Sequence, residues 1–165
     1  MPALRRIACY ALLALGLGGA HWAQAQSPAS TAAPTALAGA DGREGTFKAV
    51  QGQVTVVRGN VHSAAVVSGP VYASDRLVTG PGSAASLILR DGSVISVGPD
   101  SVMNLSSFAF NATTQEGNLL VDLLRGSLRM ATGLIAKLKP EQVKVTTPTT
   151  VVGVRGTDFI VEENP

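Results

Sequence analysis

Carboxylates are the residues in this sequence that are best suited to acid–base chemistry. Asp75 precedes an apolar run, and Asp91, Asp100 and Asp158 flank predicted turns. A carboxylate in a turn commonly accepts hydrogen bonds from nearby backbone N–H groups. A glycosidase needs two carboxylates ~5–10 Å apart across a cleft, and no spacing here indicates such a pair. We therefore expect these four residues to have structural roles, and we predict no catalytic residue.

Histidine and cysteine give no indication of a metal site or an activated nucleophile. Cys9 and one of the two histidines lie near the N-terminus, which leaves His62 in the rest of the chain. A structural zinc site draws four ligands from Cys and His side chains. A Ser-His-Asp triad would have to use His62, and the Gly-x-Ser-x-Gly motif of such hydrolases is missing from the sequence. We predict a surface histidine, no metal and no cofactor.

Arg155 is the cation whose neighbours most favour a specific contact. It lies between Gly153 and Gly156, where little crowds an extended side chain. Its candidate carboxylate partners are Asp158 and Asp91, and an anionic ligand is the alternative. We favour a structural ion pair.

The first 25 residues have the three parts of a secretory signal peptide. Arg5 and Arg6 form a basic start, an uncharged apolar run extends from Ile7 to Ala20, and Ala23–Ala25 supplies small residues for cleavage. The apolar run is shorter than the ~20 residues that a membrane-spanning helix needs. We expect cleavage before Gln26 and a periplasmic or secreted protein with no retained transmembrane segment.

Removal of this segment would leave a protein without net charge. The 13 basic residues would fall to 11, which equals the number of acidic residues. Nucleic-acid binding depends on a basic excess, so nucleic acid is a poor candidate partner. The only cysteine would also leave, and with it any disulfide. Aromatic residues make up only 4% of the chain, so we expect a core of Val, Leu, Ile and Ala.

Residues 26–44 are mostly small, with two prolines and no apolar periodicity. Such a segment cannot bury enough surface to offset its ordering entropy, which predicts a flexible spacer. The folded domain is expected at 45–165, a length suited to one domain.

Short apolar runs divided by Gly, Pro, Asn and Asp predict an all-β domain. One helical turn is expected at Leu134–Leu138. We predict a twisted β-sandwich or short β-roll of about ten strands, with a solenoid-like stack of hairpins as the alternative. The best-defined strands are Val50–Arg58, Ala84–Arg90, Val94–Val97, Val102–Leu105, Leu119–Leu124, Ser127–Met130, Val143–Thr147, Thr150–Val154 and Asp158–Val161.

Two turns are predicted from glycine-containing pairs. Asp91-Gly92 between two apolar strands indicates a hairpin with a type I′ turn, in which both residues have positive φ. Arg125-Gly126 indicates a second turn. The strand before Asp91 should place Ala85, Leu87 and Leu89 on one face.

Several strings resemble the FecR domain family. The most specific are residues 75–80 (DRLVTG), 82–89 (GSAASLIL), 91–93 (DGS) and 147–159 (TPTTVVGVRGTDF). Residues 52–54, 58–59 and 124–129 resemble the family's opening strand and a middle turn. The resemblance covers residues 45–161.

The resemblance implies a function in the cell envelope. The founding members of the family are sensors of iron uptake with a cytoplasmic anti-sigma segment, one membrane helix and a periplasmic FecR domain. This chain is more similar to the group that has a signal peptide and a lone FecR domain. The resemblance thus implies a non-enzymatic binding or signalling module, with an envelope protein or a small ligand as its partner. The alternatives are a structural adaptor that docks a partner through its edge strand, and an enzyme related to peptidoglycan or carbohydrate.

The end of the sequence suggests an open sheet edge. Members of the family commonly continue past the last strand into a further hairpin, whereas here the strand is followed by Glu162–Pro165. We expect Phe159 and Val161 to face inward on an edge strand, whose backbone groups could pair with a partner. Equally, Glu162, Glu163 and Pro165 could serve only to protect that edge.

Overall fold

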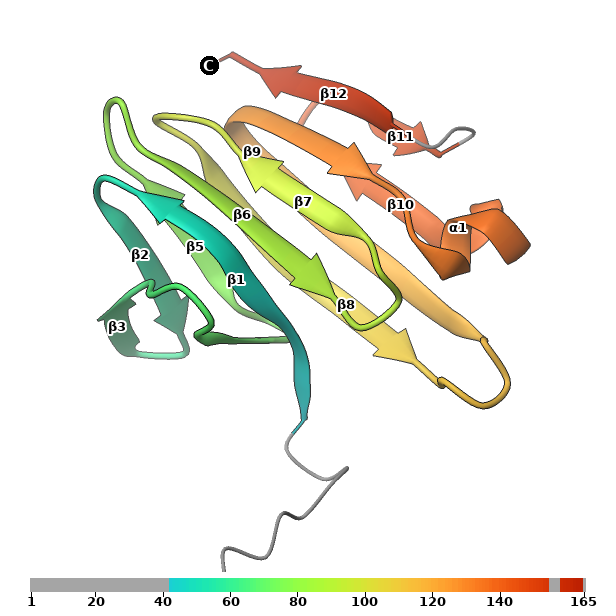
Figure 1. Cartoon of the computed structure of the whole chain (residues 1–165). Helices are drawn as coiled ribbons and strands as arrows, with labels where there is room; N and C mark the ends of the chain where they lie inside the picture. Colours follow the sequence, from blue (N-terminus) through green and yellow to red (C-terminus); the bar gives the residue numbers. More distant parts are fainter. Residues whose placement is uncertain (1–41, 155–157, 165) are drawn as a thin grey trace, which may run out of the picture. The chain divides into compact units, whose positions relative to one another are not determined.

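Strands make up most of the structure (Figure 1), and most of them alternate buried and more exposed side chains. The computed structural model describes residues 42–154 and 158–164, which belong to one compact unit, Leu37–Pro165. The all-β prediction is confirmed, with twelve strands in these residues rather than about ten. The strands are β1 Arg43–Gln51, β2 Val54–Arg58, β3 Val61–Ala64, β4 Pro70–Tyr72, β5 Arg76–Thr79, β6 Ala84–Leu89, β7 Val94–Val97, β8 Val102–Phe110, β9 Gly117–Ala131, β10 Val143–Thr146, β11 Val151–Gly153 and β12 Asp158–Glu163.

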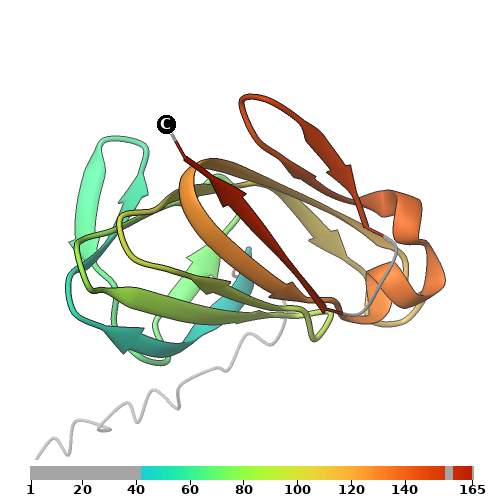
Figure 2. The same ribbon diagram turned by 90° about the horizontal axis from the view of Figure 1, so that it is seen from above.

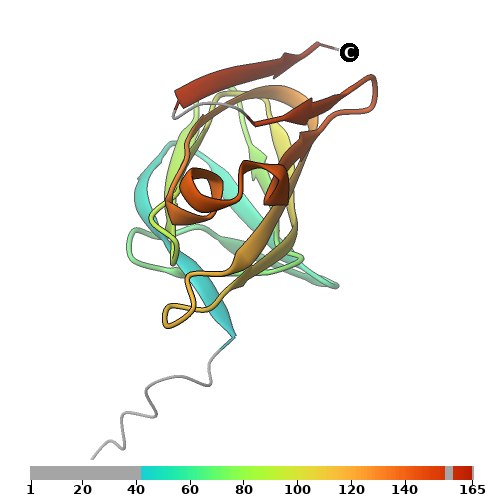
Figure 3. The same cartoon turned by 90° about the vertical axis from the view of Figure 1, so that its right-hand side faces the viewer.

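The strands form a continuous, curled sheet. Along the main path the order is β3-β2-β5-β8-β9-β7-β6-β1-β4. On the other side of β9, β10 pairs in parallel with its first half and β12 pairs antiparallel with its second half. The remaining pairs are antiparallel. Figure 3 shows the sheet wrapped around its interior, which differs from the alternative prediction of stacked hairpins.

The core lies between the two halves of this curled sheet. Leu77 and Met103 come from one half, and Leu87 and Ile95 come from the other, all without solvent exposure. The core also contains Met and Phe side chains, in addition to the expected Val, Leu, Ile and Ala. The predicted helical turn is confirmed as α1 (Leu134–Leu138), which lies across one end of the sheet (Figure 3). A 3-10 turn at Pro140–Gln142 follows it.

The β6–β7 hairpin is present, but its turn differs from the predicted type. Ala85, Leu87 and Leu89 share the buried face, as expected. The N–H of Leu89 donates to Ser93 O, and the N–H of Gly92 donates to Leu89 O at 3.0 Å. Only Gly92 has positive φ, at 83°, whereas Asp91 does not. The loop therefore has three residues, a type I turn followed by a left-handed glycine, and a single positive φ suffices.

The predicted turn at Arg125-Gly126 is wrong, because β9 is one 15-residue strand that runs through it. Gly126 has φ 91°, and the register between β8 and β9 shifts next to it. Before this point β9 pairs with β8 and β10, and after it β9 pairs with β7 and β12. A glycine with positive φ bends a strand at a bulge. Gly126 thus makes the corner where the sheet curls.

The predicted strand Val50–Arg58 is interrupted for the same reason. Gly52 has φ 73° and separates β1 from β2, which lie in different halves of the sheet. The Ser83 hydroxyl accepts the N–H of Gln53 at 2.9 Å and holds this second corner. Strand β1 also begins at Arg43, two residues before the expected start of the folded domain at residue 45.

Candidate functional site

Asp91 is a structural residue inside the β6–β7 hairpin. Its buried carboxylate accepts the backbone N–H of Ser93 at 2.9 Å and the Ser93 hydroxyl at 2.7 Å. The Ser93 oxygen in turn accepts the N–H of Gly133, and the Asp91 carbonyl accepts the N–H of Leu134. These bonds fasten the hairpin, including Gly92, to the start of α1. Both carboxylate oxygens are thus engaged within the hairpin.

Asp75 also has a structural role, and the sequence did not indicate its partner. Its fully buried carboxylate accepts the Arg58 Nε and Nη2 at 2.7 Å each and the N–H of Tyr72 at 2.9 Å. The guanidinium lies 4.0 Å from the centre of the Tyr72 ring. The hydrogen bond to Asp75 raises the pKa of Arg58. This pair fixes the β4–β5 turn against β2.

Asp158 begins β12 and is bound by an arginine of the neighbouring strand β9. The Arg129 Nε and Nη2 donate to its two oxygens at 3.0 Å and 2.5 Å. The hydrogen bond to Arg129 lowers the pKa of Asp158. Arg155 lies outside the described residues, so its pairing with Asp158 or Asp91 stays a prediction. Asp158 is the first residue of β12, and residues 155–157 before it lie outside the described residues, so a turn role for Asp158 also stays a prediction.

Strand β12 is an edge strand within the described structure. It pairs with β9 from Asp158–Ala131 to Glu163–Gly126, and none of the described strands pairs with its other side. Phe159 packs against the core and Val161 is buried, as expected for inward-facing residues. Ile160 faces outward and is 63% exposed.

Strand β11 lies opposite β12 across a cleft. β11 pairs only with β10 among the described strands, and Figure 2 shows the β10–β11 hairpin and β12 as separate arms of the domain. The cleft has a volume of about 400 Å³ and is lined by Val152–Val154 and Asp158–Glu162. At one end, the Thr149 hydroxyl donates to the Glu163 carboxylate at 2.9 Å. The cleft is therefore mostly apolar, with a hydrogen bond across one end.

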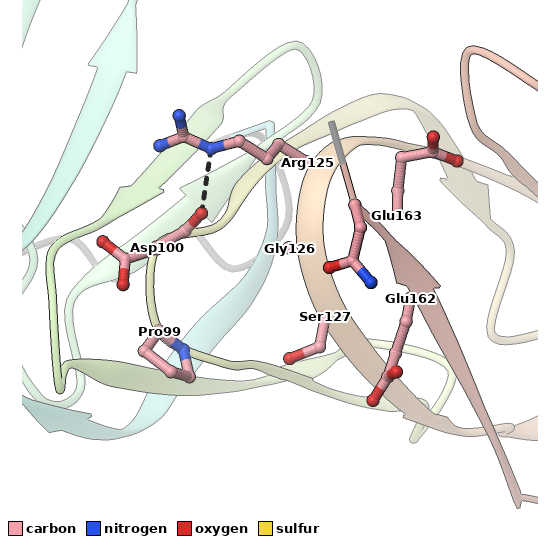
Figure 4. Close-up of a pocket in the computed structure, with 8 residues that line it drawn as sticks. Pro99, Asp100, Arg125, Gly126, Ser127, Glu162 and Glu163 are labelled. Atoms are coloured by element: carbon pink, nitrogen blue, oxygen red, sulfur yellow. Dashed lines mark hydrogen bonds between the residues drawn. The ribbon is translucent and has the colours of Figure 1, made fainter.

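A second cleft adjoins the C-terminal end of β12, at the corner formed by Gly126 (Figure 4). Its volume is about 510 Å³. The Arg125 Nε donates to the carbonyl oxygen of Asp100 at 3.0 Å. Three carboxylates and one guanidinium give this cleft an acidic excess. Its lining residues are Pro99, Asp100, Arg125, Gly126, Ser127, Glu162, Glu163 and Asn164.

The two clefts meet at Glu162, which lines both. We call the continuous surface that they form along β12 the β12 edge site. It has an apolar section beside β11 and an acidic section at the Gly126 corner. Sequence reasoning identified the strand and Phe159 but missed Asp100 and Arg125, because they join this site only through the bend in β9.

The carboxylates of the described residues are not grouped as metal ligands would be. Asp75 and Asp91 accept backbone N–H groups in turns, as predicted, and Asp100 contributes its carbonyl oxygen rather than its carboxylate. Within residues 42–154 and 158–164, no three His, Cys, Asp or Glu side chains gather as metal ligands would. The same residues include no apolar helix of membrane-spanning length.

Comparison with known proteins gives one match. The model of the FecR protein family matches residues 75–165, from the Asp75 turn through the β12 edge site. Neither the curated proteins nor the solved structures include a match to this chain. The family is regulatory and associated with the cell envelope, and it is not known for enzymes. Since the match covers more than half of the sequence, the chain belongs to the FecR family.

Proposed function

We propose that this protein is an exported, non-enzymatic binding module of the cell envelope, which signals by docking a partner protein on the β12 edge site. The observation that carries the proposal is that β12 is paired on one side only and lies beside an apolar cleft. An extended segment can add to such an edge through main-chain hydrogen bonds, while side-chain pockets provide specificity.

The side chains of β12 favour docking over simple protection of the edge. Natural edge strands usually carry charges, prolines or bulges that discourage pairing. Here Glu162 and Glu163 lie at one end, whereas the central Ile160 is a large apolar side chain with 63% exposure. The middle of the edge thus presents an apolar contact surface, on a strand whose six residues are paired on one side only.

The chemistry of the site supports one kind of partner. The apolar section beside β11 suits a strand with alternating apolar residues. The acidic section at Asp100, Glu162 and Glu163 suits a Lys or Arg at the end of that strand, since complementary charge favours encounter and correct register. We therefore infer an extended, apolar segment flanked by basic residues.

Ile160→Lys should weaken partner binding without unfolding the domain. Its side chain is exposed, so the core is unaffected, but a lysine at the centre of an edge opposes strand addition. The partner is first identified by a photo-activated cross-linker at residue 160 in the native envelope, and its affinity for the purified variants is then measured. We expect a loss of tenfold or more, about 1.4 kcal/mol, with little change in melting temperature.

Val61→Lys is the matched control. Val61 has a similar exposure, 66%, and lies on β3, another edge strand of the described sheet. This variant should bind normally, and a cross-linker at residue 61 should not trap the same partner. Equal binding by both lysine variants, or identical adducts from both positions, would exclude docking through β12.

Export is a separate part of the proposal. It is supported by Arg5, Arg6, the apolar run and the Ala23–Ala25 cleavage pattern. Mass spectrometry of the protein from its native cells should find an N-terminus at Gln26. A cytoplasmic protein that retains Met1 would contradict export, and it would leave the binding tests of Ile160 unaffected.

A further inference from the structure

A third cleft lies on the outer face of the sheet, between the β4–β5 turn and strand β8. Its volume is about 370 Å³, and it is separate from the β12 edge site. Polar side chains line most of it, and the residues are Val57, Gly59, Ser74, Arg76, Asn104 and Ser106.

Strand register brings the central residues of this cleft together. Val57 is paired with Arg76, Arg76 with Asn104, and Asn104 with Asp122. These residues form one row across β2, β5, β8 and β9. Because side chains of directly paired residues lie on the same face of a sheet, Arg76 and Asn104 are held side by side on the outer surface.

Arg76 is oriented by Asn104 but is not neutralised. Its Nε donates to the Asn104 Oδ1 at 2.8 Å. Arg58, Arg90, Arg129 and Lys139 form the ion pairs found among the described residues, and Arg76 does not take part in them. Its two terminal nitrogens thus remain available, on a guanidinium whose direction is already set.

The nearest acidic residue of this row is already satisfied. The hydroxyls of Ser106 and Thr146 both donate to the Asp122 carboxylate. Asp122 does not line the cleft, which has no carboxylate among its described lining residues. Arg76 is therefore the one charged residue among the described residues that line the cleft.

Further donors surround the guanidinium. The Asn104 side-chain N–H₂ and the Ser74 hydroxyl line the cleft without a hydrogen bond to another described side chain. Ser74 has φ 70° and is held there by its N–H, which donates to Leu105 O at 2.7 Å. A left-handed serine costs backbone energy and is maintained only by its surroundings.

We propose that this cleft binds an oxyanion, the carboxylate or phosphate group of a small solute. A guanidinium offers a planar fork that matches both groups in a two-pronged hydrogen-bonding geometry. Asn104 and Ser74 supply the additional donors, and Val57 supplies an apolar wall for the rest of the solute. The site is independent of partner docking on β12.

The proposal is tested by NMR titration of the purified protein with inorganic phosphate and, separately, with succinate, at constant ionic strength maintained with sodium chloride. Saturable shifts are expected at Ser74, Arg76 and Asn104 with at least one probe. The probe with the lower Kd identifies the preferred group. Absence of saturable shifts at these residues with both probes would overturn the proposal.

Arg76→Gln should weaken binding of that probe about tenfold or more, the effect expected for loss of charged hydrogen bonds. Arg76→Lys keeps the charge but not the fork, and should recover only part of the affinity. Lys144→Gln is the control, because Lys144 is an exposed cation on β10 outside the cleft. Equal affinity of Arg76→Gln and the unmodified protein, or an equal loss in Lys144→Gln, would show that no specific site exists. Thermal unfolding of each variant verifies that the fold is intact.

Discussion

Gly126→Ala should lower the free energy of unfolding by about 3 kcal/mol or more, through backbone strain and steric overlap. Gly126 has φ 91°, and a Cβ there would lie 2.1 Å from the Ser101 Oγ and 2.6 Å from its Cα. Ser101 is fully buried and cannot move away easily, because its hydroxyl accepts the N–H of Ser127 and donates to Pro99 O. Urea unfolding of the purified variant measures this loss.

Gly92→Ala separates strain from overlap. Gly92 has a similar φ of 83°, but a Cβ there meets no atom within 4 Å. This variant should therefore lose only the cost of a left-handed alanine, about 1–2 kcal/mol. If the two alanine variants were equally stable, Gly126 would not form a tightly packed corner, and the bend of β9 would need another explanation.

Asp75→Ala should destabilise the domain by about 2–4 kcal/mol, because it removes one partner of a buried ion pair. The variant leaves the N–H of Tyr72 without its acceptor and Arg58 without its carboxylate. The loss stays below that of a fully buried pair, since the Arg58 side chain is 49% exposed and can be solvated in part. Thermal or urea unfolding measures the change.

Asp158→Ala is the natural comparison for Asp75→Ala. Each of these carboxylates accepts hydrogen bonds from two nitrogens of its own arginine. In the Asp158–Arg129 pair, however, both side chains are exposed. Surface ion pairs contribute little, because water screens them. Asp158→Ala should thus be much less destabilising than Asp75→Ala. Equal losses would mean that burial does not govern these two pairs.

Strands whose neighbours are close in sequence could be predicted well. Ala84–Leu89 and Val94–Val97 alternate cleanly and are joined by a short glycine turn, so local pattern alone specifies the hairpin. The type of turn was missed, since a three-residue loop and a two-residue loop use the same Asp-Gly signal. The choice depends on whether Arg90 continues the strand, and the N–H of Arg90 instead donates to Glu44 O on β1.

The glycines at the corners show why other boundaries could not be predicted. Gly52 lies inside a predicted strand and divides it. Gly126 lies in a predicted turn but is part of one continuous strand. Both have positive φ, and the sequence offers the same residue in each case. What happens at each glycine depends on the strands that pair before and after it, and these are distant in the chain.

The sequence by itself determined the all-β class, the FecR resemblance, the inward side of the last strand and the local roles of Asp75 and Asp91 as acceptors in turns. These properties depend on alternation and turn chemistry within a few residues. Only the tertiary structure decided that Arg58 pairs with Asp75, that Arg129 pairs with Asp158, and that Asp100 and Arg125 join the end of β12. Each of these contacts joins residues that the curling of the sheet brings together, and the curl arises from cross-strand pairing over long separations, which no local pattern encodes.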